Sequence, residues 1–394
     1  DCLLSRGLGD VYKRQHLEKN MSSMIHDLVA ISKEAAASTP GHPVYVAGDI
    51  TMTGEQLRPM GKMELEDLIA IYKEQILCLV DAGADLLVVE TMMSLAETRA
   101  ALIAAKEVCD LPVIATLTFE ADGRTLFGTD AKTAAVVLES LGASAIGANC
   151  STGPAQMEGI ISDMVSVTTI PIIAKPNAGL PFLDENGTTC YNMEAEEFAE
   201  EMEVLVNAGA TILGGCCGTT PEFIRQIHER FGTDAKVAAS RRPDGIRYLT
   251  SERITHSFGL DDGFFVVGER INPTGKKALQ AQLREGSFEK VIQFAEEQEA
   301  CGAKVLDINM GMSGIDEKAS MLRALEEVIG VTNLPLSLDS SYVEVLEAAL
   351  RNYPGRALVN SVSLETEKFE KLLPIVAKYG AMFILLPLSD AGLP

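Results

Sequence analysis

A motif that repeats along the chain constrains its fold more than any other feature. In each repeat, an amphipathic helical stretch ends in Gly-Ala, and a short apolar segment follows at once. Glycine after the last helical residue takes up the left-handed conformation that closes a helix, and the apolar segment behind it is typical of a strand buried on both faces. The alternation predicts βαβ units and a parallel sheet. The copies of the dipeptide are Gly83-Ala84, Gly142-Ala143, Gly209-Ala210, Gly302-Ala303 and Gly380-Ala381.

The same pattern locates the individual elements. Helices are expected between the strands, for example over 62–82, 95–108 and 195–208. Polar residues gather where strands of the first part end, and sites at the carboxyl ends of parallel strands are typical of (β/α)8 barrels. We therefore expect an α/β protein with two (β/α)8 TIM-type barrels in tandem, both incomplete in this chain, and a doubly wound sheet is the alternative. The expected strands are 44–50, 86–92, 113–119, 145–151, 172–177 and 211–217, then 264–271, 305–310, 336–340, 357–362 and 382–388.

The repeat is interrupted once, which divides the chain. Residues 231–262 are polar, include the basic pair Arg241-Arg242, and are expected to form a linker. We expect residues 16–230 to form the first barrel, without its first strands, and residues 263–394 to form the second, without its C-terminal strands. Residues 1–15 have mixed charge and no periodicity, and we expect them to be foreign to the first domain.

The pattern with the clearest chemistry is a pair of adjacent cysteines enclosed by glycines, Gly214-Gly215-Cys216-Cys217-Gly218. A third cysteine, Cys150, ends an earlier expected strand. The glycines allow a tight backbone, so both thiolates of the pair can face one soft cation. Three thiolates leave an open position on tetrahedral zinc, which is the arrangement of a catalytic site. The alternative is that Cys216 and Cys217 are small buried residues at the end of a strand.

The composition of the chain excludes some classes of binding partner. The formal net charge of −23 argues against nucleic acid or an anionic membrane, because both are polyanions. No apolar run approaches the roughly 20 residues that span a bilayer, and the N-terminal residues do not resemble a signal peptide. The 8 cysteines have no framework spacing, so we expect free thiols and a cytoplasmic protein.

These motifs together resemble a known pair of domains. Residues 20–230 resemble the homocysteine S-methyltransferase domain, and residues 262–394 resemble a pterin-binding methyltransferase domain. In this order, the pair is similar to the N-terminal half of cobalamin-dependent methionine synthases. The segments that carry the resemblance are 89–91, 147–154, 176–181 and 214–221 in the first part, and 268–273, 306–309, 336–339 and 359–361 in the second.

The resemblance implies a zinc site in the first domain. Cys150, Cys216 and Cys217 would bind the ion, and the sulfur of homocysteine would take the open position. Zinc coordination converts a thiol into a thiolate, which is the nucleophilic form. Glu90, at a strand end on the same rim, would be a catalytic-site residue that anchors the ammonium group of homocysteine. The alternative for Glu90 is a solvated or helix-capping carboxylate.

In the second domain, the resemblance implies a pterin site. A pterin presents an amidine-like edge of donors beside a carbonyl, and carboxylates and amides can pair with that edge in a bidentate way. Each such residue alone could be a helix cap or a turn residue, whereas several at neighbouring strand ends favour binding. The implied contacts are Glu269, Asn272, Asp339 and Asn360, with Asp307 and Asn309 on the same rim.

The implied reaction passes a methyl group from 5-methyltetrahydrofolate through cobalamin to zinc-bound homocysteine, which gives methionine. No cobalamin-binding segment is recognised, so methylcobalamin would be held by a module supplied in cis or in trans. We expect the chain to be a fragment that is unstable or inactive alone, because open barrel edges leave backbone unpaired. One alternative is a homocysteine S-methyltransferase that uses another methyl donor or is fused to a folate reductase. Another is a structural thiolate-zinc protein in which Cys190 or Cys301 is the fourth ligand.

Overall fold

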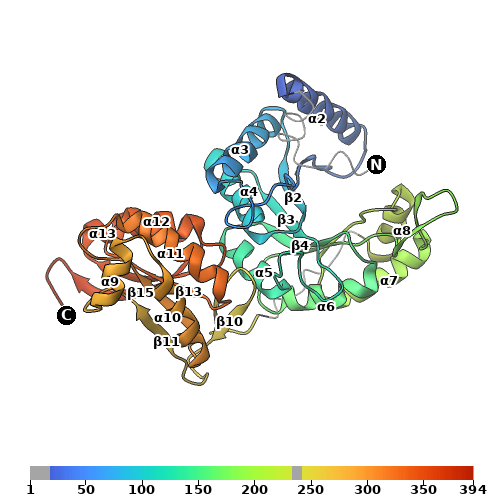
Figure 1. Ribbon diagram of the computed structural model, residues 1–394. Coiled ribbons are helices and arrows are strands. Elements are labelled where there is room, and N and C mark those ends of the chain that lie inside the picture. The colour runs from blue at the N-terminus through green and yellow to red at the C-terminus, as the bar shows by residue number, and fades with distance from the viewer. Residues whose placement is uncertain (1–17, 233–241, 394) are drawn as a thin grey trace. The chain divides into compact units, whose positions relative to one another are not determined.

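The computed structural model describes residues 18–232 and 242–393. The segment 1–15, expected to be foreign to the first domain, lies outside the described residues. The chain forms two compact units, Asp1–Arg242 and Pro243–Pro394 (Figure 1). Each unit is described by itself below.

The N-terminal unit is built on a six-stranded sheet with the strand order β1-β2-β3-β4-β5-β8. Every pairing in this sheet is parallel, which confirms the predicted βαβ organisation. A hairpin of β6 (Pro181–Leu183) and β7 (Thr189–Tyr191) is inserted after β5. The strands of the sheet are β1 (Ala47–Ile50), β2 (Leu86–Met92), β3 (Val113–Leu117), β4 (Ala145–Asn149), β5 (Ile172–Lys175) and β8 (Ile212–Leu213).

Helices connect successive strands, and they are arranged along the sheet in the order in which they occur in the chain (Figure 1). Helix α3 packs against α4, and α6 packs against α5 and α7. Side chains cap two of these helices: Ser94 accepts a hydrogen bond from the backbone of Glu97 in α4, and Asp130 accepts one from Thr133 in α5. The helices are η2 (Glu18–Asn20), α2 (Met21–Ala37), α3 (Leu65–Asp81), α4 (Leu95–Val108), α5 (Ala131–Ser140), α6 (Pro154–Val165), α7 (Ala195–Ala208) and α8 (Pro221–Phe231).

The glycines of the repeated motif end helices as predicted. Gly83, Gly142 and Gly209 have φ angles of 89°, 88° and 117° in the N-terminal unit. Gly302 and Gly380 have φ angles of 91° and 65° in the other unit. A residue with a Cβ rarely adopts this conformation, so glycine at these positions closes each helix and directs the chain into the next strand.

The C-terminal unit repeats the plan with a five-stranded parallel sheet in the order β11-β12-β13-β14-β15. Helices again alternate with the strands, and Asp316 caps α11 by accepting a hydrogen bond from the backbone of Ala319. The strands are β11 (Val267–Ile271), β12 (Val305–Asn309), β13 (Leu336–Asp339), β14 (Leu358–Leu364) and β15 (Met382–Ser389). The helices are α9 (Lys277–Arg284), α10 (Glu289–Ala300), α11 (Glu317–Val331), α12 (Val343–Asn352) and α13 (Thr366–Lys378).

An antiparallel hairpin precedes this sheet, in residues for which the sequence suggested a linker. It consists of β9 (Arg247–Thr250) and β10 (Thr255–Phe258). The hydroxyl of Tyr353 donates a hydrogen bond of 2.8 Å to the backbone oxygen of Thr250. The backbone of Arg356 donates one of 2.8 Å to the Thr250 hydroxyl. The hairpin is therefore fixed to the C-terminal unit.

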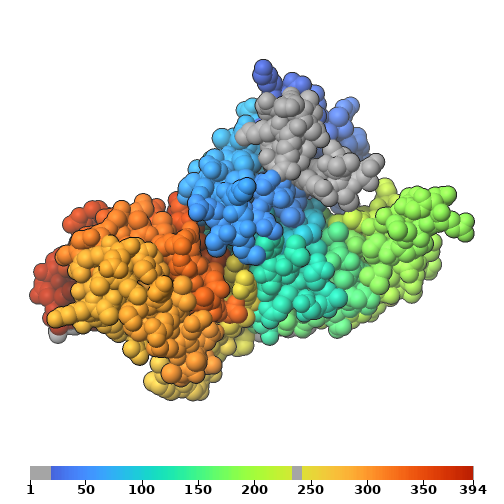
Figure 2. Space-filling view, viewed as in Figure 1, coloured from blue at the N-terminus to red at the C-terminus, as the bar shows by residue number. Residues whose placement is uncertain are grey.

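Strand β15 is an edge of the C-terminal sheet and carries exposed apolar side chains. The last residues of the chain, red in Figure 2, lie at the margin of this unit. Within the described residues, no strand pairs with the outer edges of β1, β8, β11 or β15. The parallel α/β class is thus confirmed for both units, whereas closure into barrels stays a prediction. The exposed side chains of β15 are Phe383, Ile384, Leu385 and Leu386.

None of the helices in the described ranges is long and apolar enough to cross a membrane.

Candidate functional sites

The carboxyl ends of the N-terminal parallel strands bring chemically active side chains to one edge of the sheet. Asp49 lies in β1, Glu90 in β2, Asn149 at the end of β4, and Lys175 at the end of β5. The cysteine pair follows β8, and Cys150 follows β4. Parallel strands place all their carboxyl ends on the same side, so residues far apart in the sequence share this rim.

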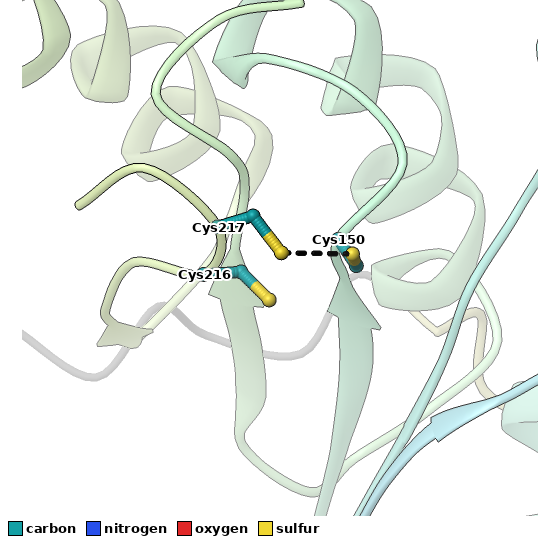
Figure 3. A group of neighbouring side chains, drawn as sticks. All are labelled: Cys150, Cys216 and Cys217. Carbon is teal, nitrogen blue, oxygen red and sulfur yellow. Dashed lines mark hydrogen bonds between the residues drawn. The ribbon is translucent and has the colours of Figure 1, made fainter. Parts of the chain in front are cut away.

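The three cysteines of the predicted metal site lie together on this rim. Their sulfur atoms are all within 4.8 Å of one another, and the sulfurs of Cys150 and Cys217 are 3.7 Å apart. Figure 3 shows Cys216 and Cys217 pointing from the loop after β8 toward Cys150 at the end of β4. All three are partly exposed. Within the described ranges, no other Cys, His, Asp or Glu joins this group, and so neither Cys190 nor Cys301 does.

The donor set suits a tetrahedral soft cation. Zinc–sulfur distances of about 2.3 Å in a tetrahedral site place two ligand sulfurs roughly 3.8 Å apart. The observed separation of 3.7 Å between Cys150 and Cys217 agrees with this value. Three thiols held at this spacing can bind one zinc ion with little rearrangement.

Backbone hydrogen bonds between neighbouring loops hold the cysteines in place. The N–H of Cys150 donates to the oxygen of Lys175 (3.0 Å), and the N–H of Cys216 donates to the oxygen of Pro176 (2.9 Å). The side-chain oxygen of Asn177 accepts from the N–H of Cys217 (3.2 Å). The segment after β5 thus lies between the two cysteine loops and joins them.

Cys150 has a strained backbone. Its φ angle is 65°, and that of the following residue, Ser151, is 63°. Residues other than glycine rarely adopt such angles, and they are found mostly where surrounding structure enforces them at functional sites. The strain turns the chain sharply at the end of β4 and leaves the Cys150 thiol at the rim.

The thiols influence one another's proton affinity. The pKa of Cys150 lies below that of a free thiol, because the Cys216 thiol donates a hydrogen bond to its thiolate form. That same contact, together with burial, raises the pKa of Cys216. In the absence of a cation, Cys150 is therefore the member of this pair that ionises first, and its thiolate is stabilised by the Cys216 thiol.

Asn149 connects four strand ends through its buried side chain, which is 1% exposed. Its Oδ1 accepts hydrogen bonds from the N–H of Thr91 (3.0 Å) and the hydroxyl of Thr116 (2.7 Å). Its Nδ2 donates to the hydroxyl of Thr91 (2.8 Å) and lies 3.8 Å from the sulfur of Cys216. The sequence analysis included Asn149 in a motif but did not assign it a role.

Glu90, the predicted anchor for an ammonium group, already has a cationic neighbour. Its carboxylate forms an ion pair with the ammonium group of Lys175, and both side chains are largely buried. Asp49 is close to this pair, and its Oδ1 is buried without a hydrogen-bond partner. Burial and the charge of Glu90 raise the pKa of Asp49 to about 7. The sequence analysis assigned no role to Lys175, although a lysine that ends an apolar strand was a usable signal.

The C-terminal unit gathers the predicted pterin contacts at the ends of its strands. Asp307 is 3% exposed, and its Oδ1 accepts hydrogen bonds from the Ser337 hydroxyl (2.6 Å) and from Asn360 (3.2 Å). Its Oδ2 is buried without a partner. Burial raises the pKa of Asp307 and that of Asp339.

The remaining predicted contacts lie near Asp307. The side-chain nitrogen of Asn272 donates to the carboxylate of Glu269 (2.9 Å), which is exposed. Asn309 shares a hydrogen bond with the carboxylate of Asp339. Negative charges of Glu269 and Asp339 act on Asp307, so these residues form one electrostatic group.

Comparisons with known proteins give two family matches, and methionine synthases are among the relatives that align over most of the chain. A family model described as homocysteine S-methyltransferase matches residues 8–231, and one described as pterin binding enzyme matches residues 268–390. The methionine synthase of Mycobacterium leprae (strain TN) is 31% identical over 372 residues, which cover 90% of this chain and 30% of that protein. The methionine synthase of Mycobacterium tuberculosis (strain ATCC 25618 / H37Rv) is 31% identical over 394 residues, 95% of this chain and 32% of that protein. The chain thus spans about a third of the length of these relatives.

Among solved structures, the homocysteine methyltransferase MmuM of Escherichia coli is similar to part of the chain. Its metallated form has a TM-score of 0.47 and 21% sequence identity, and the match covers 57% of this chain and 76% of that one. Its apo form has a TM-score of 0.44 and 22% identity, and the match covers 53% and 73%.

Proposed function

Because the chain belongs to the homocysteine S-methyltransferase family, we propose that its N-terminal unit binds homocysteine and methylates the sulfur of this substrate. The observation that carries the proposal is the cluster of thiols from Cys150, Cys216 and Cys217 at the rim of the sheet. Among the described residues, this cluster has three ligand groups rather than four. A tetrahedral cation bound there keeps one position for a substrate sulfur, as a catalytic zinc site requires.

Zinc is the cation that this donor set fits best. Thiolate ligands and a tetrahedral sulfur spacing are both characteristic of zinc sites. When bound, zinc would lower the pKa of a coordinated thiol, so the substrate sulfur would be a thiolate at neutral pH. Cys150, Cys216 and Cys217 would hold it, and their partial exposure leaves the site accessible from the rim.

The charged residues beside the cysteines suit the amino-acid end of homocysteine. Glu90 anchors the ammonium group, and Lys175, its ion-pair partner, offers a cation to the carboxylate. A zwitterionic amino acid can exchange partners with this pair without leaving any charge unpaired, which avoids the large cost of an isolated buried charge. The pair therefore offers one charge of each sign to the two charged groups of the substrate.

The overall change at sulfur is a substitution. The thiol of homocysteine loses its proton, a new carbon–sulfur bond forms to the methyl carbon, and the donor retains the electron pair of the bond that breaks. The product, methionine, has a neutral thioether. A thioether is a weaker metal ligand than a thiolate, so a metal held by the three cysteines would bind the product less tightly than the substrate.

The methyl donor proposed for the C-terminal unit is 5-methyltetrahydrofolate. The buried and unpartnered Oδ2 of Asp307 supports this assignment, because a pterin ring offers N–H donors to such an acceptor. The match of residues 268–390 to pterin binding enzymes supports it as well. The other contacts would come from Glu269, Asn272, Asn309, Asp339 and Asn360.

A cobalamin-binding module, in cis or in trans, would carry the methyl group from the folate to homocysteine. The support for this step is the similarity to methionine synthases over both units in the same order. The chain spans about a third of those relatives, so the complete route is part of the proposal. Three reduced thiols at one site are typical of a reducing compartment, and we place the protein in the cytoplasm.

The first test is the zinc content of the purified 394-residue chain. We expect one zinc per chain, lost in Cys216→Ala and retained in Cys301→Ala, because Cys301 is exposed and outside the cluster. Folded protein with no zinc, or equal zinc in both variants, would contradict the metal site.

A second measurement separates a catalytic from a structural zinc site. Cobalt(II) substituted for zinc reports on its ligands through its absorption spectrum. Addition of homocysteine should change that spectrum, whereas methionine at the same concentration should not. A spectrum that does not respond to homocysteine indicates a closed, structural site and overturns the proposed function.

A further inference from the structure

We propose that Asn149 is a positioning residue that orients Cys216 in the metal site through an N–H···S hydrogen bond. This inference rests on the function proposed above, since it assumes that Cys216 is a metal ligand. It concerns a side chain that contacts neither the reacting atoms nor the metal.

Its neighbours determine how the Asn149 amide is oriented. The backbone N–H of Thr91 and the hydroxyl of Thr116 face one end of this amide, at 3.0 and 2.7 Å. A backbone N–H can only donate, so the atom that it faces must be the oxygen. The opposite end is then the NH2 group, with its hydrogens directed toward the Thr91 hydroxyl and the sulfur of Cys216.

The Asn149 side chain uses all of its hydrogen-bonding capacity. An asparagine amide has two acceptor positions and two donors. Three of them are used by Thr91 and Thr116, as described above, and the remaining hydrogen faces Cys216 at 3.8 Å. Asn149 is 1% exposed, so no solvent competes for that hydrogen, and an unmet buried donor is costly. The sulfur of Cys216 is therefore the acceptor that completes the set.

The residues around the Asn149 amide hold it rigidly. Thr91 has a φ angle of 58°, which is unusual for a β-branched residue. Its N–H and hydroxyl both bind the Asn149 amide, and these two bonds help to hold the strained backbone in place. The hydrogen bonds with Thr91 and Thr116 thus fix the amide to β2 and β3, and its remaining hydrogen faces the loop that follows β8.

The hydrogen bond has two consequences for the metal site. It fixes the position of the Cys216 sulfur, and it reduces the electron density that this sulfur donates to the metal. Residues that hydrogen-bond to a metal ligand without contacting the metal orient that ligand. Their loss typically lowers metal affinity about 10- to 100-fold. An N–H donor stabilises the lone pairs of a thiolate, so its removal should make the sulfur a stronger electron donor to the metal. That electronic effect can be observed apart from any loss of packing.

The experiment uses the full chain, with its zinc exchanged for cobalt(II). We compare Asn149→Ala with Thr118→Val, a control that removes a buried hydrogen bond to the backbone of Asn149 but leaves its amide intact. Asn149→Ala should bind cobalt about 10- to 100-fold more weakly. Its thiolate-to-cobalt charge-transfer band should move to longer wavelength. Thr118→Val should retain the parental affinity within about threefold and the parental band position.

A second variant covers the possibility that Asn149→Ala does not fold. Asn149→Asp keeps an acceptor for Thr91 and Thr116. It replaces the NH2 group by an oxygen that, when ionised, has no hydrogen to donate and adds a negative charge, so its band should also move to longer wavelength. A folded Asn149 variant with the parental affinity and spectrum overturns the inference. Failure of the parent chain to bind cobalt at all would instead overturn the metal site proposed above.

Discussion

The sulfur atoms of Cys150 and Cys217 lie 3.7 Å apart, although the two residues are 67 positions apart in the sequence. The strand order explains this proximity. Strand β5 pairs with β4 on one side and with β8 on the other, so the loops that carry the two cysteines flank the same strand. Hydrogen bonds from both loops to the segment after β5 then bring the thiols together.

Metal removal should expose the cysteines to oxidation. In the zinc-free chain, we expect a mild oxidant to form a disulfide between Cys150 and Cys217, because a small movement brings sulfurs 3.7 Å apart into bonding distance. Zinc occupies the lone pairs of the thiolates and should prevent this reaction. Peptide mapping by mass spectrometry identifies the pair. Equal oxidation of the zinc-loaded chain, or preferential reaction of the exposed Cys301, would contradict the expectation.

Asp49 should make the zinc-free protein less stable as the pH rises. Its pKa is raised from 3.8 to about 7 in the folded state, so the folded chain retains a proton that the unfolded chain releases in this range. The free energy of unfolding therefore falls between about pH 4 and pH 7. An asparagine side chain at this position imitates the protonated form at every pH. We expect Asp49→Asn to match the parent near pH 4 and to be more stable by about 2–4 kcal/mol at pH 8, measured by urea unfolding with a chelator present.

Asp85 provides a control, because its ionisation should change the free energy of unfolding in the opposite direction to that of Asp49. Its pKa is lowered by a hydrogen bond from Lys33, so its ionised form stabilises the folded chain at neutral pH. That contribution is lost as the pH falls through the folded-state pKa. Asp85→Asn should therefore be less stable than the parent at pH 8 and equal to it at low pH. If both variants shift stability in the same direction at pH 8, the explanation given for Asp49 is wrong.

Asp307 should control the affinity of the C-terminal unit for folate. Replacement by asparagine substitutes a donor for one carboxylate oxygen, so the N–H edge of a pterin loses an acceptor. We expect Asp307→Asn to weaken the binding of 5-methyltetrahydrofolate at least about tenfold, measured by isothermal calorimetry, since a charged hydrogen bond contributes about 1.5–3 kcal/mol. Asp261→Asn, at an exposed position, should leave the affinity unchanged. Parental affinity in a folded Asp307 variant would exclude this role.

Gly147 should be intolerant of any side chain. A Cβ at this position would lie 1.8 Å from the backbone oxygen of Ile173 in the adjacent strand. Gly147→Ala must therefore separate β4 from β5, and we expect a loss of about 1–3 kcal/mol in the free energy of unfolding. Gly159, in α6, faces open space, and Gly159→Ala should be neutral or stabilising by up to about 1 kcal/mol. Thermal unfolding of both variants checks the contrast.

Much of the fold could be predicted because its signals are local. The glycine that ends each helix and the apolar strand that follows it are neighbours in the sequence, and all of the predicted strands were found in the structure. The hairpins β6–β7 and β9–β10 were missed, because their strands have only three or four residues and little periodicity.

The site was predictable only in part. The types of the proposed ligands were evident, since adjacent cysteines between glycines suggest a soft metal wherever they lie. The ion pair of Glu90 with Lys175 and the unpartnered oxygen of Asp49 were not, because they depend on which strands are neighbours. The same holds for Asp307, whose partners Ser337 and Asn360 come from two other strands.

The sequence by itself determined the parallel α/β class, the helix ends and the identity of the thiol groups, because each follows from residues close together in the chain. The tertiary structure alone decided how these groups act on one another. Hydrogen bonds and charge interactions extend over only a few ångströms, and strand order sets which side chains come that close. The four contacts of Asn149 involve three residues located 33 to 67 positions away. No pattern along the chain encodes such a set, and it exists only when β2, β3, β4 and β8 end at the same rim.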